Sequence, residues 1–182
     1  MIKIIKYLNN YRALCFAFGS TFAMVFYATF ILGDVSRCYR LDVGSNSLGL
    51  SFFYTQEMVE NFFESRTKGQ LLCYSQFLKI WDVIFAFIYT LMYVSWTLLL
   101  FSNKRLFFTV PILCMFADWA ENYLELLMLE TYLNSGLISE LIVSYGSGIN
   151  SLKLTLSYLT ILIILVGIVM ALKVFFTKPK VA

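Results

Sequence analysis

Four long apolar stretches constrain this chain of 182 residues more than any other feature of its sequence. Each has about 20 residues, the length that an α-helix needs to cross a hydrocarbon core of about 30 Å. None alternates polar and apolar residues as a strand would, and a long segment in lipid must satisfy its own backbone as a helix. The sequence therefore predicts an all-α polytopic membrane protein with four transmembrane helices in an antiparallel bundle, at about 13–32, 77–101, 107–129 and 154–172.

The composition agrees with a chain that is solvated by membrane lipids. Hydrophobic residues make up 60% of it and charged residues 14%, against about half and about a quarter in soluble domains. The gaps between the apolar stretches are too short for a separate soluble domain, so we expect 1–182 to be a single transmembrane domain. The net charge of +3 is small and scattered, which argues against nucleic-acid binding.

The first apolar stretch has two interpretations. Its basic start and the small residues at 19–23 resemble a cleaved signal peptide, but the apolar run continues well beyond them. We expect an uncleaved anchor. More of the basic residues flank the side that holds both termini and the short connection at 102–106, and no acidic residue lies in those segments. By the positive-inside rule, both termini are predicted to be cytoplasmic.

Histidine is absent, and the four cysteines show no C-x-x-C spacing. Histidine is the commonest general base and metal ligand near neutral pH. These absences argue against a metal site and against Ser-His or Cys-His catalysis, and no cofactor is indicated. Cys38 and Cys73 lie near the two ends of the first outer loop, so a disulfide between them would join helices 1 and 2 in an oxidising compartment.

The long first outer loop, about 33–76, contains a short amphipathic helix. Four apolar residues between Met58 and Phe63 recur at helical spacing opposite three glutamates, and Thr55 precedes them as a candidate N-cap. We expect this helix to pack over the ends of the bundle or to lie on the membrane surface, rather than to bind a partner. A second outer loop is expected at about 130–153.

The third stretch departs from a purely apolar span. Asp118, Glu121, Asn122 and Glu125 follow helical spacing and form one stripe, with Asp118 close to mid-membrane. Helix 2 runs the opposite way, which places Asp82 at the depth of the outer acids and Tyr89 at the level of Asp118. The two helices would face each other as a column: Lys79, Asp82, Tyr89 and Tyr93 against Glu125, Glu121, Asn122 and Asp118.

Each ionised acid at this depth costs about 2.5 to 3.5 kcal/mol on insertion scales, so such residues face the bundle interior or a wet cavity. We therefore expect a ligand-binding site formed by Asp82, Asp118, Glu121, Asn122, Glu125 and Tyr89. The alternative is that these side chains only hydrogen-bond the helices together. Candidate cationic partners are Lys79, Lys153, Arg66 and Lys68, while helices 1 and 4 are expected to face lipid or to serve packing only.

Several of these residues also carry a resemblance. The segments Tyr54-Thr55, Gly69-Gln70-Leu71-Leu72-Cys73-Tyr74 and Asp118-Trp119-Ala120-Glu121-Asn122, together with Asp82, span about half of the chain. They resemble a set of uncharacterised, mostly bacterial, four-helix membrane proteins with an Asp in helix 2 and an Asp-x-x-Glu-Asn motif in helix 3. Gln70 stands where those proteins have Arg. The resemblance implies a four-helix membrane fold and no activity.

Three functions fit these features. An acidic site between helices 2 and 3 would bind a proton, a cation or a lipid headgroup. A non-catalytic accessory subunit would pack against a partner membrane protein, or against copies of itself as a homo-oligomer. A membrane-embedded lipid-modifying enzyme would use paired carboxylates for acid–base chemistry. This last function is less favoured, because the chain has no G-x-G-D-like motif and no nucleophile elbow.

Overall fold

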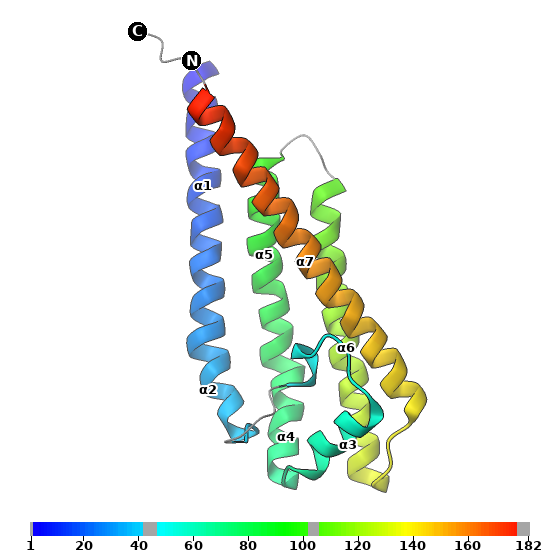
Figure 1. Cartoon of the computed structure of the whole chain (residues 1–182). Coiled ribbons are helices and arrows are strands. Elements are labelled where there is room, and N and C mark those ends of the chain that lie inside the picture. Colours follow the sequence, from blue (N-terminus) through cyan, green and yellow to red (C-terminus); the bar gives the residue numbers. More distant parts are fainter. Residues whose placement is uncertain (1, 42–46, 102–105, 178–182) are drawn as a thin grey trace.

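The computed structural model describes residues 2–41, 47–101 and 106–177. Within these residues the chain is all-α, and no strand is present. Four long helical rods form a bundle, with Ile2 and Thr177 at one end and the segment between the first two rods at the other (Figure 1). We call these the termini end and the loop end. The predicted tight connection at 102–105, and the basic residues Lys104, Arg105, Lys178 and Lys180 used for the orientation, lie outside the described residues.

Two of the rods are built from several helical segments in sequence. The first consists of α1 (Ile2–Phe26), a π-helical segment (Tyr27–Leu32), α2 (Gly33–Val35) and a short 3₁₀ turn (Ser36–Cys38). The second consists of α4 (Lys68–Gln76), a second π-helical segment (Phe77–Asp82) and α5 (Val83–Leu100). The third and fourth rods are single helices, α6 (Leu106–Ser135) and α7 (Glu140–Thr177).

Three rods are long and apolar enough to cross a membrane, over Tyr11–Cys38, Lys68–Leu100 and Glu140–Lys173. The third rod, α6, has 30 residues but is not among them. Its middle carries the acidic stripe, which lowers its hydropathy. A helix of 30 residues is about 45 Å long, so its length alone exceeds the hydrocarbon core of about 30 Å.

The helices extend further toward the loop end than predicted. The second begins at Lys68 rather than near 77, and the expected second outer loop, about 130–153, is helical except for Gly136–Ser139. The added turns bury residues such as Leu71 and Val143 against other parts of the protein instead of lipid. The point where hydropathy falls therefore marks the end of the apolar run of residues and not the end of the helix. Thr67 and Gln70 form a capping box that fixes the true start of α4.

The turn between α6 and α7 is closed by a glycine. Gly136 has φ of +71°, a left-handed conformation that favours glycine, and its N–H donates to the carbonyl of Tyr132 over 2.8 Å. The two helices then run side by side as an antiparallel hairpin (Figure 1).

The predicted amphipathic helix is confirmed as α3, Gln56–Glu64. Thr55 caps it by accepting a hydrogen bond from the Met58 N–H, as its position predicted. Its apolar face is buried: Val59 and Phe63 have no exposed surface, and Phe63 stacks near Tyr132 of α6. The helix therefore packs over the loop end of the bundle.

Two further contacts hold the loop segment in place. Cys38 and Cys73 form a disulfide that joins the end of the first rod to α4, which agrees with the pairing considered from the sequence. The Arg66 guanidinium is buried over the Phe62 ring and donates to the carbonyls of Tyr39 and Phe62. Burial lowers the pKa of Arg66.

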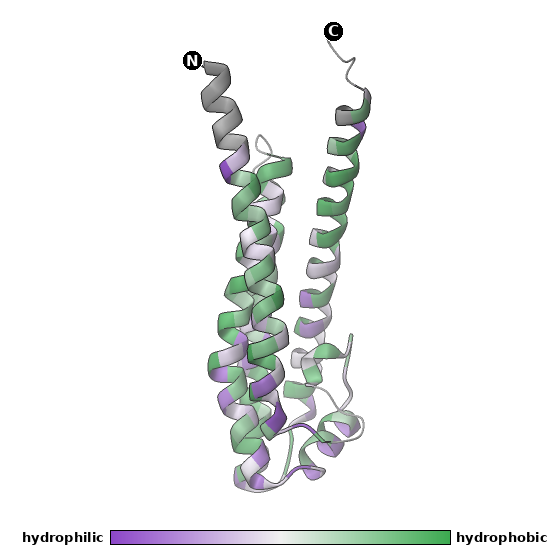
Figure 2. Cartoon of the chain, turned by 90° about the vertical axis from the view of Figure 1, so that its left-hand side faces the viewer, coloured by the Kyte–Doolittle hydropathy of each residue, from purple (hydrophilic) through white to green (hydrophobic). Residues whose placement is uncertain are grey.

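Polar residues lie mainly in the half of the bundle nearer the loop end (Figure 2). In the other half, α1 packs on α5 through small residues, with a hydrogen bond of 2.8 Å between the hydroxyls of Ser20 and Ser95. The fourth rod packs mainly on α6 and also on α5. Near its far end, Gly167 of α7 lies against the side chain of Phe101. In this half both α1 and α7 contact α5, and they pack less on each other.

Candidate ligand-binding cavity

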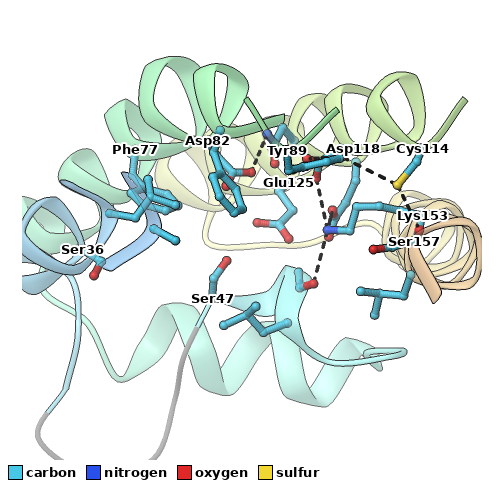
Figure 3. A pocket seen from close by; sticks show the side chains of 18 of the residues that line it. Ser36, Ser47, Phe77, Asp82, Tyr89, Cys114, Asp118, Glu125, Lys153 and Ser157 are labelled. Carbon is cyan, nitrogen blue, oxygen red and sulfur yellow. Dashed lines mark hydrogen bonds and ion pairs between the residues drawn. The ribbon is translucent and has the colours of Figure 1, made fainter. Parts of the chain in front are cut away.

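A cavity of about 390 Å³ lies among the rods toward the loop end. All four rods and the segment after the first rod contribute to its wall (Figure 3). Its size falls in the range of about 300 to 1,000 Å³ that is typical of small-molecule sites. The six residues predicted to bind a ligand all line it: Asp82, Tyr89, Asp118, Glu121, Asn122 and Glu125.

Helices α5 and α6 meet in the register that the depth argument predicted. The Asn122 side-chain amide donates to Asp82 Oδ2 over 2.8 Å, and the Tyr89 hydroxyl donates to Asp118 Oδ2 over 3.0 Å. Asp118 and Asn122 are almost completely buried. These pairs hold the two helices together, so part of the stripe does serve as hydrogen-bonding contact between helices.

The fourth rod supplies the counter-charge. Lys153 of α7 extends between the helices, with its Nζ 3.3 Å from Asp118 Oδ1, and it forms an ion pair with Glu121 Oε2 (Figure 3). Its side chain is largely buried, as are both carboxylates. Lys153 was among the cationic partners considered from the sequence, so the fourth helix, which is otherwise mostly exposed, also contributes a charged residue to the cavity. Of the other candidate cations, Lys79 and Lys68 are exposed and do not line the cavity.

Glu125 occupies the end of the stripe nearest the loop. The hydroxyl of Tyr74 donates to its Oε2. The other oxygen of Glu125 and the Oε1 of Glu121 have no hydrogen-bond partner among the described residues, although both side chains are 1% exposed. A buried acceptor without a partner costs about 1 to 3 kcal/mol, and a charged one costs more. The two carboxyl groups are close enough to hydrogen-bond each other when one of them carries a proton, which offsets part of this cost.

Residues 47–54, which we call the lid, cover the cavity at the loop end. Four contacts attach the lid to one face of α7. Lys153 Nζ donates to the carbonyl of Gly49 over 3.3 Å, and Ser151 Oγ donates to that of Phe52 over 2.8 Å. The Asn150 amide donates to the carbonyl of Ser51, and the Tyr54 N–H donates to Ser147 Oγ over 3.0 Å.

The lid passes close to the acids at Gly49. A Cβ at Gly49 would lie 2.8 Å from Glu121 Oε1 and 3.1 Å from Lys153 Nζ. The lid also places Tyr54 near the acids, and its buried hydroxyl has no hydrogen-bond partner among the described residues. Burial and the negative charges of Glu125 and Glu121 raise the pKa of Tyr54 far above its usual value.

Two π-helical segments face each other beside the cavity. The Tyr27 hydroxyl in the first donates to the carbonyl of Trp81 in the second over 3.0 Å. Ala28 and Leu32 of one segment, and Phe77 and Asp82 of the other, line the cavity. The wider turn of a π-helix shifts the register of the residues that follow it, and such segments are frequent at functional sites. Here one of them sets the position of Asp82.

Sequence reasoning missed the lid, the Glu125 partner Tyr74 and both π-helical segments. The capping box at Thr67 and Gln70 would have shown that α4 begins early enough to bring Tyr74 beside the acids. Nothing in the residue types of 47–54 indicated a contact with α7, because those contacts are made largely to backbone carbonyls.

The chemistry of the cavity is acidic on one side and apolar on the other. Four carboxyl groups line it, against the basic residues Lys153 and Arg40. The described residues contain no group of three Cys, Asp or Glu side chains close enough together to hold a metal ion. The acidic side is suited to a donor such as an ammonium group. Comparisons with protein-family models, with curated proteins and with solved structures gave no match to this chain.

Proposed function

We propose that this chain is a four-span membrane protein, with both termini cytoplasmic, whose cavity binds a molecule bearing a positively charged hydrogen-bond donor. A primary amine, such as that of a lipid headgroup, is the group that the wall suits best. The observation that carries the proposal is the acidic end of the cavity wall, formed by the neighbouring carboxyl groups of Glu121 and Glu125. They face a cavity in which acids outnumber basic residues.

The span beyond the three described above is α6, the third rod. Its polar side chains are turned toward the cavity, Lys153 and α5, which removes most of their charge from lipid. The lipid-facing surface of α6 then needs only its apolar residues, such as Leu113 and Phe116, which are exposed. The cytoplasmic placement of the termini rests on the basic residues of the sequence, and the disulfide at the opposite end suits an oxidising compartment.

Thiol labelling of intact cells tests this topology. In a chain whose free cysteines Cys15 and Cys114 are replaced by serine, we expect Ser135→Cys to react with an impermeant maleimide in intact cells. Thr177→Cys should react only after the membrane is permeabilised. Labelling of both positions from the same side would refute the four-span arrangement.

Ligand-induced stabilisation tests the binding site. The protein is placed in phosphatidylcholine nanodiscs, and its thermal unfolding is followed by tryptophan fluorescence at pH 7 with primary alkyl amines or the matching alcohols. A ligand that binds only the folded state stabilises it by about 2.7 kcal/mol at 100 times its dissociation constant. We expect the amines, and not the alcohols, to raise the unfolding midpoint of the wild type.

The variants assign that effect to the two acids. Glu125→Gln and Glu121→Gln should lose the response to amines, and Glu130→Gln, an exposed residue of the same helix, should keep it. Equal responses to amines and alcohols, or a response that survives in Glu125→Gln, would overturn the proposal. The accessory-subunit and lipid-modifying functions stay predictions, since no contact within the described residues favours either.

A further inference from the structure

The shape of the cavity restricts the ligand beyond its charged group. The cavity follows α5 from Asp82 to Tyr93, a rise of about 16 Å at 1.5 Å per residue. This length exceeds that of a small headgroup. Its far end is closed by a hydrogen bond of 3.0 Å between Tyr93 and Ser157, two residues that also line it. The site is therefore a channel along the helices rather than a round pocket.

The polarity of the wall changes along this channel. The acids and the lid lie toward the loop end, where the buried carboxyl groups of Glu121 and Glu125 form part of the wall. The side formed by the first rod is apolar, with Met24, Ala28 and Leu32, and Leu154 of α7 faces it. One end suits a charged group, and the long side suits a hydrocarbon chain.

The apolar side of the cavity lies between two rods that pack mainly on different helices. The first and fourth rods both line the cavity, but α1 packs mainly on α5, and α7 packs mainly on α6. Figure 2 shows α7 diverging from the other helices toward its C-terminal end. Toward the loop end, by contrast, the lid lies across the cavity and is attached to α7 by four side chains. A molecule that reaches the site from the bilayer would pass between α1 and α7.

We infer that the ligand is an amphiphile with a primary amine and a single hydrocarbon chain, and that it comes from the bilayer between the first and fourth rods. The inference rests on the proposed function. The amine pairs with the carboxyl groups of Glu121 and Glu125 under the lid. The chain lies along Met24, Ala28 and Leu154, with its end toward Tyr93 and Ser157.

Chain length provides the test. Wild-type protein in phosphatidylcholine nanodiscs receives decylamine, propylamine or decanol at equal concentrations, and thermal unfolding is measured. We expect decylamine to raise the unfolding midpoint by several degrees and the other two compounds to leave it within error. If propylamine stabilises the protein as strongly as decylamine, the chain contributes nothing, and this inference fails while the proposed function stands. If no amine has an effect, or if decanol equals decylamine, both fail.

Substitution of the apolar side distinguishes the cavity from general partitioning into lipid. Ala28→Phe fills the channel, whereas Ala23→Phe adds the same ring to an exposed position of the same rod. We expect Ala28→Phe to abolish the effect of decylamine and Ala23→Phe to keep it. Ser157→Leu provides a second obstruction if Ala28→Phe does not fold. A decylamine effect that survives in the folded obstructed variant would overturn the inference.

Discussion

The two ends of the bundle are stabilised by different interactions. At the loop end, large side chains are buried inside protein: Tyr74 and Phe63 have no exposed surface, and they belong to one continuous apolar core with residues of the lid, α3 and three rods. At the termini end, large side chains such as Phe22 and Val169 are 73% and 64% exposed. Lipid must solvate these, and the helices meet through small residues and hydrogen bonds such as that of Ser20 with Ser95.

The apolar side chains of the two ends therefore have different alternative environments, which are water at the loop end and lipid at the termini end. Burial of apolar surface drives assembly at the loop end, where the alternative is water. Between helices in lipid this drive is absent, because lipid tails are as apolar as the side chains. The cavity lies where the two regimes meet, so its acids are covered by the lid from one side and embedded among helices on the other. Four predictions test this comparison, given from the largest expected effect to the smallest.

Removing the buried ammonium should have the largest effect. Lys153→Met leaves Asp118 and Glu121 without their ion pair, and breaking a buried pair costs about 3 to 5 kcal/mol. Denaturation in mild detergent measures the free energy of unfolding, with Lys68→Met as the exposed control. The second substitution Glu121→Gln should restore part of the loss in Lys153→Met. If Lys153→Met is as stable as the wild type, the ion pair does not hold α7 to α6.

The aromatic residues of the two ends should respond differently to truncation. Phe63→Ala creates a cavity in the loop-end core and should cost about 3 to 5 kcal/mol. Phe22→Ala removes a ring that faces lipid and should change stability by no more than about 0.5 kcal/mol. The same denaturation experiment measures both. Equal losses would show that the two ends are held by similar burial.

The disulfide should stabilise the loop end alone. Cys38→Ser removes a bond that closes a loop with a sequence separation of 35, and native disulfides contribute about 2 to 4 kcal/mol. Limited proteolysis should then cleave the lid faster, while the helices remain protected. Cys15→Ser, a free and exposed cysteine, serves as the control. Unchanged cleavage of the lid would mean that its contacts with α7 suffice to hold it.

The hydrogen bond near the termini end should matter least. Ser20→Ala removes the contact with Ser95, and such bonds between membrane helices average about 0.6 kcal/mol. Thr29→Ala, at an exposed position of the same rod, is the matched comparison. Double-mutant analysis with Ser95→Ala measures the coupling. A loss of stability above about 2 kcal/mol would contradict the small contribution that contacts between helices are expected to make in this half.

The rise per residue of an α-helix predicted much of the contact between α5 and α6. Placing α5 and α6 antiparallel, with 1.5 Å per residue, put Tyr89 level with Asp118 and Asp82 near Asn122, and both pairs are hydrogen-bonded. Spacing works for Tyr89, Asp118 and Asn122 because they lie on regular helices whose relative direction follows from a short connection. The π-helical segment that ends at Asp82 leaves that residue within reach of Asn122. Cys38 and Cys73 were paired correctly because few positions on that side carry a cysteine.

The parts that escaped prediction depend on tertiary contacts. Lys153 was one of four candidate cations, and only the packing of α7 on α6 selects it. The lid binds α7 through backbone carbonyls, which every residue type provides, so no residue pattern marks it. The π-helical segments have no sequence signature either, although they decide where Asp82 points.

The turn Gly136–Ser139 also bears on how the chain is inserted during synthesis. It separates the helix that carries Asp118 and Glu121 from the helix that carries Lys153. Each such charge at the centre of a lone span costs about 2.5 to 3.5 kcal/mol. As a hairpin, the two helices bring opposite charges into contact, so their joint cost is smaller than the sum of the separate costs. In the four-span arrangement proposed above, α6 and α7 would therefore enter lipid more easily as one unit, and the turn is short enough to keep them together.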